Sequence, residues 1–589
     1  MQASQIVLQY FKKHWFRYTS GLIVVFIATY LNTMIPRRLG FAVDALAASE
    51  INIDAVKRVA LSLAFIAVGA FLSRFLWRYL IMGFCRYIEF HLREKLFSHL
   101  QKLYPDYYVR NNTGDIITRL IVDVQAIRAM IGFGTVSIID AVVTVVLSII
   151  NMSLSINGLF TLMAFAPIPL LVFLLIKLRL LIRKRYGKVQ ESISDIASKV
   201  QENITGIRVI KSFSQEEKES AVFNILSTNK LKAETTLARA FAVMNPSVSL
   251  AFGIVFSVFL VAGGSMVAKS QVSLGDFVSF NSYLLLIMNP ISNIGKIVDR
   301  WQRGMTSMKR LDKILLEEPT ITDAKADMNI TTLDSGSISA KDLSFSFTNG
   351  NQILKNISFD IPHGGSLAIM GPTGCGKTKI LELIMRLWEC DEDMLFVDGH
   401  DINKIPLKTL RNECAFVPQD TFLFSDTITE NIRFYKNNIS DEQVIEAAKA
   451  AFVHDNISDF PKGYNTVLGE RGMTLSGGQK QRVALARAIA AKPKILLLDD
   501  CMSAVDAETE REILGNLKNI IADCTFVIVT HRLSASSLAN KILLLSSEGE
   551  IEEYGSHQEL ISSGGTYCKM VEDILAQESL NEEEGDSVE

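Results

Sequence analysis

SLAIMGPTGCGKTKILELIMRL, residues 366–387, decides the fold of the second half of this 589-residue chain. It holds the pattern GxxxxGKT between an apolar, strand-like run and a helix-like run, so backbone N–H groups and a helix N-terminus can cradle phosphates. Lys377 is expected to contact the β- and γ-phosphates of ATP, and Thr378 to ligate Mg²⁺. The candidate ATP-binding residues here are Gly371, Pro372, Thr373, Gly374, Cys375, Gly376, Lys377 and Thr378.

A second apolar run, KILLLDD at 494–500, ends in two carboxylates and is typical of a buried parallel strand beside the phosphate loop. Asp499 is expected to hold the Mg²⁺ shell together with Thr378. In most ATPases of this plan the following residue is a Glu that orients the attacking water. Here it is Asp500, one methylene shorter, and misplacement of about an ångström can cost on the order of 100-fold in rate.

A third motif, LSGGQ, lies between these two and comprises Leu475, Ser476, Gly477, Gly478 and Gln479. Its hydroxyl and glycine amides at a helix start would present donors to a γ-phosphate. With this motif the sequence resembles the nucleotide-binding domains of ABC transporters. The resemblance implies that two such domains pack head to tail, so that each LSGGQ reaches the ATP held by the opposite domain.

Further family motifs follow in order. The resemblance assigns adenine stacking to Phe347, Mg²⁺ contact and coupling to Gln419, an acidic exporter loop to Glu470, the D-loop to Ser503 and Asp506, and the switch histidine to His531. Relatives commonly carry Thr or Ser where this chain has Lys379, whose charge can still bind phosphate.

Apolar segments crowd into roughly the first 300 residues, where about 20 apolar residues are needed for each membrane crossing. The expected spans are Ser20–Ile35, Val59–Phe84, Gly134–Ser155, Leu159–Leu181, Pro246–Val267 and Phe277–Ile294. Six spans are an even number, so both ends of the chain are expected on the same side of the membrane. Cations precede the first span and follow the fourth, so that side is expected to be the cytosolic side of the cell membrane of a bacterium.

Two long gaps between spans suggest helices that continue into the cytosol, with short transverse helices at Asn111–Thr118 and Thr205–Gln215. This layout resembles type IV exporters. The expected fold class is an all-α six-helix transmembrane domain followed by an α/β P-loop ABC nucleotide-binding domain. The expected domains are an interfacial helix (1–18), the transmembrane domain (19–315), a linker (316–335), the ATP-binding domain (336–575) and an acidic disordered tail (576–589).

Ionisable and polar residues within spans are costly in hydrocarbon and are candidates for function. Asp140, Arg78 and Asn281 are the candidate substrate-cavity residues. The alternative for Asp140 is a place near the headgroups or a structural hydrogen bond between helices.

An altered catalytic position beside an intact LSGGQ resembles one subunit of heterodimeric multidrug exporters. The expected function is ATP-driven outward transport of amphiphilic drugs or lipids, with Asp500 and His531 in a slow site and LSGGQ completing the site of a second half-exporter. The alternatives are a lipid or peptide exporter and a regulatory, non-transporting ATP-sensing subunit.

Charge and cysteine content exclude other classes. The 60 Lys+Arg and 63 Asp+Glu leave a net charge of −3, which gives no electrostatic case for a nucleic-acid partner. Seven cysteines without CxxC spacing argue against a disulfide framework or a zinc site. ATP, Mg²⁺ and membrane lipids remain as the expected ligands.

Overall fold

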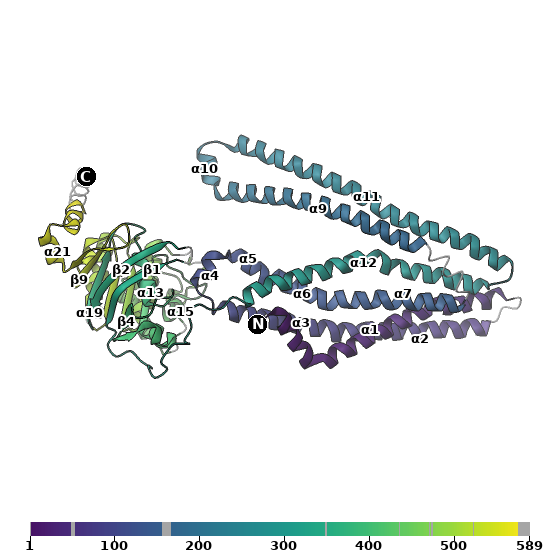
Figure 1. Ribbon diagram of the computed structural model, residues 1–589, viewed down its shortest axis with the longest axis horizontal. Helices are drawn as coiled ribbons and strands as arrows, with labels where there is room; N and C mark the ends of the chain where they lie inside the picture. The colour runs from purple at the N-terminus through teal and green to yellow at the C-terminus, as the bar shows by residue number, and fades with distance from the viewer. Residues whose placement is uncertain are drawn as a thin grey trace. The chain divides into compact units, whose positions relative to one another are not determined.

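The computed structural model describes residues 2–48, 53–155, 167–347, 350–434, 436, 438–469, 472, 475–521 and 523–574 (Figure 1). The chain divides into two compact units. The helical unit comprises Met1–Gln101 and Asn111–Glu317, and the ATP-binding unit comprises Lys102–Arg110 and Glu318–Glu589.

The helical unit is built from long helices. They are α1 (Ala3–Ala47), α2 (Ile53–Trp77), η1 (Arg78–Met82), α3 (Gly83–Leu100), α5 (Thr113–Thr118), η2 (Arg119–Asp123), α6 (Val124–Ala129), η3 (Met130–Gly134), α7 (Thr135–Ser155), α9 (Pro167–Thr205), α10 (Ile207–Ser212), α11 (Glu216–Ala268) and α12 (Leu274–Leu315).

Three helical stretches in the described part of the chain are long and apolar enough to cross a membrane: Ala3–Ala47, Ile53–Leu100 and Thr113–Leu154. They carry the first three predicted spans, and Gly253–Ala268 is a shorter apolar stretch that overlaps the predicted fifth, Pro246–Val267. The predicted fourth span begins outside the described residues, at 159–166.

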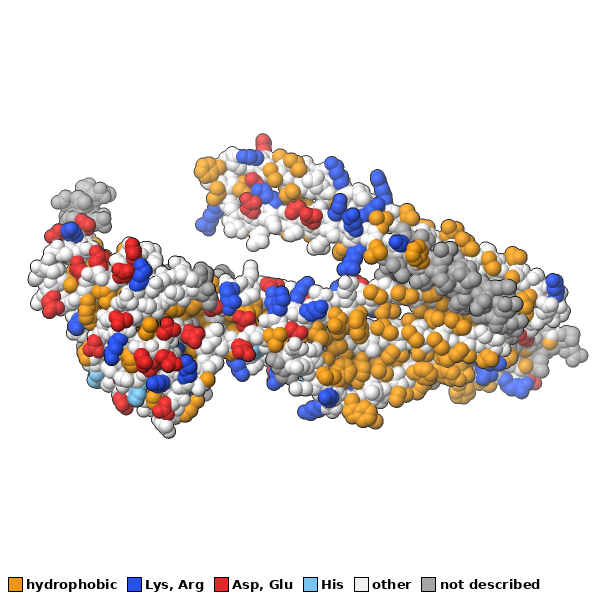
Figure 2. Space-filling model, viewed as in Figure 1, with side chains coloured by type: hydrophobic (Ala, Val, Ile, Leu, Met, Phe, Trp, Pro, Cys, Tyr) orange, Lys and Arg blue, Asp and Glu red, His pale blue; other side chains and the backbone are white. Residues whose placement is uncertain are grey.

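The surface of this unit is apolar where a soluble protein would be polar. In α2, the side chains of Leu61, Phe65, Phe71 and Phe75 are all exposed, and Figure 2 shows hydrophobic side chains gathered over the helices of this unit. Contiguous apolar surface of this extent needs a non-aqueous partner. The unit is therefore built to face lipid.

Helices α9 and α11 form a hairpin with α10 at its tip (Figure 1). Ile182 and Val189 of α9 pack against Leu237 and Ala240 of α11. Near the tip, the Lys199 ammonium lies 2.7 Å from a Glu219 carboxylate oxygen. The short helix α10 lies within the predicted transverse segment Thr205–Gln215.

The ATP-binding unit contains two sheets. Its strands are β1 (Ile338–Ser346), β2 (Gln352–Ile361), β3 (Ser366–Met370), β4 (Leu395–Val397), β5 (His400–Asp401), β6 (Cys414–Val417), β7 (Ile495–Asp499), β8 (Thr525–Val529), β9 (Lys541–Leu545) and β10 (Ile551–Gly555). Its helices are α4 (Pro105–Arg110), α13 (Lys377–Ile384), η4 (Ile402–Lys404), α14 (Leu407–Glu413), α15 (Ile428–Arg433), α16 (Asp441–Ala450), α17 (His454–Ser458), η5 (Gly463–Asn465), α18 (Gly477–Ala490), α19 (Ala507–Ile521), α20 (Leu533–Ser536) and α21 (His557–Ser563).

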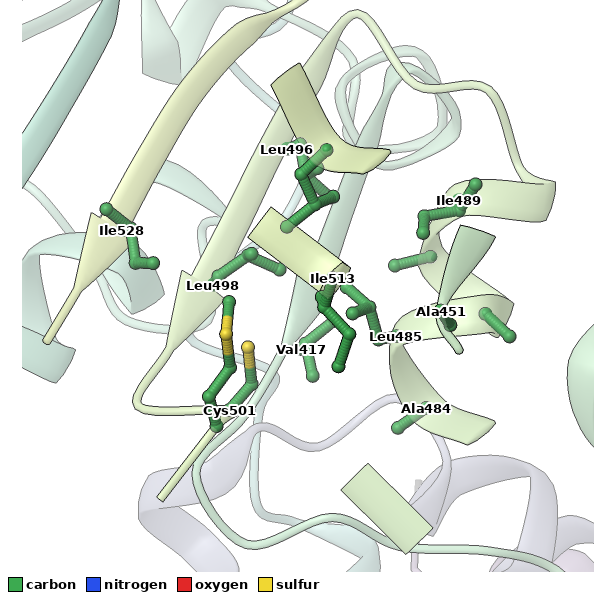
Figure 3. Packing of buried hydrophobic residues seen from close by; sticks show 14 of the residues in the cluster. Val417, Ala451, Ala484, Leu485, Ile489, Leu496, Leu498, Cys501, Ile513 and Ile528 are labelled. Carbon is green, nitrogen blue, oxygen red and sulfur yellow. The ribbon is translucent and has the colours of Figure 1, made fainter. Parts of the chain in front are cut away.

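The larger sheet has the strand order β10-β9-β3-β8-β7-β6, parallel except at β10. Every residue of β3, β7 and β8 is buried, as expected where both faces of a parallel sheet are covered. Leu496 and Leu498 of β7 pack against α18 and α19 on one face (Figure 3). Ile495 and Leu497 point to the other face, which packs against the smaller antiparallel sheet β2-β1-β4-β5.

Within the ATP-binding unit, Tyr104, the residue before α4, packs beside Arg411. The Arg411 guanidinium lies over the Tyr104 ring, 5.4 Å from its centroid, and donates to the Arg386 carbonyl at 2.7 Å. The segment that joins this unit is therefore Lys102–Arg110, directly before the predicted Asn111–Thr118, which stays with the helical unit. Two helices begin here: Pro105 occupies the first position of α4, where proline is tolerated, and Asn112 caps the next helix, α5.

Asp398 ties the start of the ATP-binding domain to the turn between β4 and β5. Its carboxylate accepts the amides of Asp334, Ser335 and Ser337 at 2.7, 3.0 and 2.9 Å. Burial alone would raise the pKa of Asp398, but these hydrogen bonds and the Ser335 hydroxyl lower it to about 2.

We predict that Asp398→Asn weakens this tie. A carboxyl whose folded pKa is depressed contributes stability above its unfolded pKa of about 4, and the contribution is lost as the pH falls through about 2. At neutral pH, hydrogen exchange of the Ser335 and Ser337 amides in the full chain should therefore speed up by about tenfold or more. Asp391→Asn, at an exposed acidic residue, is the control; equal exchange in both variants would contradict the assignment.

Candidate functional site

The predicted motif residues meet at one edge of the six-stranded sheet. Strands β3, β8, β7 and β6 are neighbours and parallel, with Ile369 opposite Val529, Asp499 opposite Val529 and Val417 opposite Leu498. The residues that follow these strands therefore share the carboxyl edge, where α/β sheets bind ligands. They are Gly371, His531, Asp500 and Gln419.

The phosphate loop requires glycine at two positions where its backbone lies very close to neighbouring residues. Gly371 has φ of +143° and Gly376 has φ of +100°, conformations that other residues rarely adopt. A Cβ at Gly371 would lie 2.5 Å from the Leu545 carbonyl oxygen, and one at Gly376 would lie 2.7 Å from Ile353. The loop therefore wraps tightly between β3 and α13, with no room for side chains at these positions.

Lys377 is buried at the start of α13, and its ammonium folds back over the loop. It donates to the carbonyls of Gly371 at 2.8 Å and Pro372 at 2.7 Å. Burial lowers the pKa of Lys377 below its ordinary value, and neighbouring acidic groups oppose this in part. A charge held in this position favours an anionic ligand, which would add the counter-charge that the loop lacks.

The Thr378 hydroxyl donates to Asp499 Oδ1 at 3.1 Å. Asp499 is buried at the end of β7; burial raises its pKa, and the hydrogen bond from Thr378 lowers it in part. Among the described residues no cluster of three His, Cys, Asp or Glu side chains has the arrangement of a metal site. A hydroxyl and one carboxylate nevertheless fit Mg²⁺, which usually keeps several waters and takes few protein ligands beside substrate phosphates.

Asp500 has φ of +42°, and its N–H donates to the Val529 carbonyl at 2.9 Å. Burial raises the pKa of Asp500, while the charges of His531 and Arg532 lower it. Partial burial and the Lys377 charge lower the pKa of His531. The structure thus brings the predicted catalytic pair to the same edge as the phosphate loop.

Phe347 lies in an aromatic cluster with Trp388, their ring centroids 5.2 Å apart. Lys379 points into this cluster: its ammonium lies 4.1 Å from the Trp388 ring centroid and 5.1 Å from that of Phe347. It also forms an ion pair with Glu382, which accepts the Trp388 indole N–H at 2.8 Å. Lys379, which was expected to bind phosphate, thus lies beside Phe347, which was expected to stack on adenine.

Ser476 is the N-cap of α18. Its hydroxyl accepts the Gln479 amide at 3.3 Å, and the Gln479 side chain accepts the Ser476 amide at 3.0 Å. This capping box fixes the LSGGQ turn at a helix start, while Leu475 is buried in the core below it. The turn is therefore rigid and presents Ser476 and Gly477, both exposed, to the surroundings.

The segment Ser503–Asp506 packs against α18. Gln481 binds it twice, donating to the Ser503 hydroxyl and accepting the Ala504 amide, both at 3.1 Å. Asp506 then caps α19 by accepting the Thr509 amide at 2.9 Å. LSGGQ and the D-loop are thus one structural piece.

Sequence reasoning missed Trp388, Glu382 and Gln481, because none of them belongs to a motif. Only the proximity of Gln481 to LSGGQ, two residues along the same helix, offered a signal. Gln419 lies exposed after β6, as its position past a strand end predicts, and Glu470 is outside the described residues.

The three candidate cavity residues lie on different helices. Asp140 of α7 accepts a hydrogen bond of 2.6 Å from the buried Thr29 hydroxyl of α1. Arg78 lies over the Trp77 ring, and the Asn281 side-chain oxygen is buried without a hydrogen-bond partner among the described residues. The structure shows no hydrogen bond or ion pair joining the three in its described part.

Comparison with known proteins places both halves in one family. Residues 19–291 match the family described as "ABC transporter transmembrane region", and residues 354–503 match "ABC transporter". The chain is 32% identical to "Probable multidrug resistance ABC transporter ATP-binding/permease protein YheI" of Bacillus subtilis, over 98% of each chain. It is also 32% identical to "Multidrug resistance-like ATP-binding protein MdlA" of Escherichia coli, over 95% of each.

The fold is similar to a solved structure, a bacterial Atm1-family ABC exporter with ATP bound. The TM-score is 0.80 at 25% identity, covering 95% of this chain and 98% of that one. The predicted fold class, a helical transmembrane domain followed by an α/β ATP-binding domain, is confirmed.

We predict that the two glycines of the LSGGQ turn differ sharply in how well they tolerate substitution by alanine. A Cβ at Gly478 would lie 2.6 Å from the Ala504 carbonyl oxygen, whereas one at Gly477 would lie 3.6 Å from the Ala504 Cβ. Gly478→Ala should displace the D-loop and lower the free energy of unfolding by about 1–3 kcal/mol. Gly477→Ala, the matched control, should not; thermal unfolding of the full chain compares them, and equal midpoints would refute the packing argument.

Proposed function

Since this chain belongs to the ABC transporter family, as a membrane-embedded exporter whose ATP-binding domain follows its transmembrane helices, we propose that it exports amphiphilic drugs or lipids as one half of a heterodimer. The observation that carries the proposal is the convergence of Lys377, Thr378, Asp499 and His531 at one sheet edge, with Asp500 at the catalytic position. The relatives YheI and MdlA, which carry multidrug resistance in their names, support the substrate class.

ATP binding is a property of the family domain, and the residue roles are our proposal. The loop Gly371–Thr378 would wrap the phosphates, and Lys377 would exchange its two carbonyl partners for phosphate oxygens. Phe347 would stack on adenine, and Lys379 would reach the α-phosphate once it leaves Glu382.

Thr378, Asp499 and Gln419 would hold Mg²⁺. The bound ion would neutralise charge on the β- and γ-phosphates. The contact of 3.1 Å between the Thr378 hydroxyl and Asp499 supports this assignment, because two hard oxygen ligands already face each other there.

Asp500 is proposed to make this site slow. Its carboxylate would orient the attacking water, with His531 near the γ-phosphate, but from a side chain one methylene shorter than Glu. The site would then retain ATP and hold the two ATP-binding domains together. This supports a division of labour in which faster hydrolysis takes place at the other site.

LSGGQ of this chain would complete the partner's site. The capping box at Ser476 supports this role, because it fixes the turn before any ligand arrives. A regulatory, ATP-sensing subunit is the second candidate, favoured by Asp500 alone. Lys377 in place and an intact LSGGQ weigh against it, and a dedicated lipid or peptide exporter remains the alternative within transport.

Coupling would be mechanical, through short helices at the tips of the helical extensions. Within the ATP-binding unit, Tyr104, which directly precedes α4, already lies beside Arg411. Helix α10 exposes Ile207 and Val209, with Phe213 following it, and would contact the partner's ATP-binding domain. ATP would drive the change by binding the closed state more tightly than the open one.

Topology and substrate contacts complete the proposal. The cations before the first span favour an N-terminus and an ATP-binding domain in the cytosol. Asn281, with a buried side-chain oxygen and no partner among the described residues, supports a polar contact for substrate within the spans. For Asp140, the hydrogen bond from Thr29 favours the structural alternative.

We predict that the purified chain alone hydrolyses ATP slowly, and that Asp500→Asn changes the turnover of the reconstituted heterodimer by less than about twofold. Glu→Gln at the matching partner position should lower it by on the order of 100-fold, because that site carries the flux. Phosphate release in proteoliposomes measures both, and Lys377→Ala, which should abolish nucleotide binding at this site, is the control. Brisk hydrolysis by this chain alone that Asp500→Asn abolishes would overturn the proposal.

A further inference from the structure

The first 43 residues of the chain carry five cations and no acidic residue. The cations are Lys12, Lys13, Arg17, Arg37 and Arg38. The first three lie where α1 bends, since His14 has non-helical backbone angles (φ −127°, ψ 28°) inside this helix. The bend joins an N-terminal segment to the first membrane-crossing stretch.

Aromatic packing fixes the bend in place. The rings of Tyr10, Phe11 and Tyr18 lie 5.3, 4.9 and 5.0 Å from that of Phe84, which is fully buried. The Tyr18 hydroxyl donates to the Ile131 carbonyl at 2.8 Å. The bend itself is therefore held in a defined position against α3.

Arg17 extends from this bend across the start of α3. Its guanidinium lies 5.9 Å from the Tyr79 ring centroid and 5.8 Å from that of Tyr87. It fits over Gly83, where a Cβ would lie 2.6 Å from the Arg17 Nη2. The two rings and the glycine form a seat for a planar cation.

No carboxylate neutralises this seat within the described residues. Arg17, Lys12 and Lys13 form no ion pair among these residues, and the buried Glu89 of α3 is already paired with three arginines. These are Arg86 at 3.2 Å, Arg93 at 3.0 Å and Arg128 at 2.9 Å. The bend therefore carries positive charge that would attract an external anion.

The same bend exposes large apolar side chains. Trp15 is 61% exposed and Phe16 is 72% exposed, with their rings edge to face. The exposed apolar surface continues along α1 at Ile23 and Phe26. Aromatic side chains beside cations at the end of a membrane-crossing helix are typical of the headgroup region of a bilayer.

From this juxtaposition we infer that Arg17, seated over Gly83 between Tyr79 and Tyr87, binds the phosphate of an anionic glycerophospholipid, with Lys12 and Lys13 attracting its net negative charge. A lipid fits better than a free phosphate because the acyl chains would cover the exposed apolar surface of α1. A zwitterionic headgroup, as in phosphatidylcholine, carries no net negative charge and would gain no net attraction from Lys12 and Lys13. The inference depends on the chain lying in a membrane, not on the heterodimer.

Native mass spectrometry of the full chain in detergent tests the site with phosphatidylglycerol and phosphatidylcholine of identical acyl chains. We expect the wild type to bind phosphatidylglycerol more tightly, and Arg17→Gln to weaken its tightest binding by about fivefold, the effect of one basic residue at an anionic surface. Lys309→Gln, at an exposed cation of α12 without an ion pair among the described residues, should leave binding unchanged. Excess inorganic phosphate should not displace the lipid.

Two further variants test the site independently of Arg17→Gln, in case that variant does not fold. Lys12→Gln with Lys13→Gln alters only exposed side chains and should weaken phosphatidylglycerol binding while leaving phosphatidylcholine unaffected. Gly83→Ala keeps every charge but pushes the guanidinium aside, and should weaken binding as well. Equal affinity for the two lipids in the wild type, an unchanged affinity in Arg17→Gln, or displacement by free phosphate would each overturn the inference.

Discussion

The parallel pairing of β3, β8, β7 and β6 is the constraint on which the ATP site depends. Because these strands run in one direction, the chain leaves each of them at the same edge, and Gly371, His531, Asp499 and Gln419 are brought together from distant positions in the sequence. Burial of both sheet faces holds that register, since a shift by one residue would exchange the two cores on either side. Packing far from the ligand thus sets the geometry of the site.

The sequence predicts the parts of the site whose chemistry needs a particular residue type. Glycines with positive φ, a buried lysine and a hydroxyl beside a carboxylate have few substitutes, so Gly371, Gly376, Lys377 and Thr378 are readable as a motif. Trp388 was missed because a ring that packs against Lys379 follows no fixed spacing. Its role comes from tertiary packing.

In the helical unit, too, some features are predicted from the sequence and others depend on tertiary packing. Apolar length predicts spans, and α1, α2 with α3, and α6 with α7 meet that requirement. Helix α5 lies within the predicted transverse segment Asn111–Thr118, whereas the neighbouring α4, which begins at Pro105, was not predicted. Composition alone does not distinguish two adjacent short helices, and the seat of Arg17 over Gly83 likewise needs α1 and α3 to be brought side by side.

Asp500 combines a constrained backbone with a short side chain at the proposed catalytic position. Its N–H is tied to the Val529 carbonyl of β8, and its φ of +42° lies in a region that Asp and Asn tolerate better than most residues. The Cα is therefore fixed by the sheet, and the reach of the carboxylate is set by side-chain length alone. A Glu would extend that reach by one methylene, but it adopts a left-handed backbone less readily than Asp. Because this left-handed backbone suits the shorter side chain, Asp500 is compatible with stable folding at the end of β7, and the same backbone constraint that places its Cα also limits how far its carboxylate reaches.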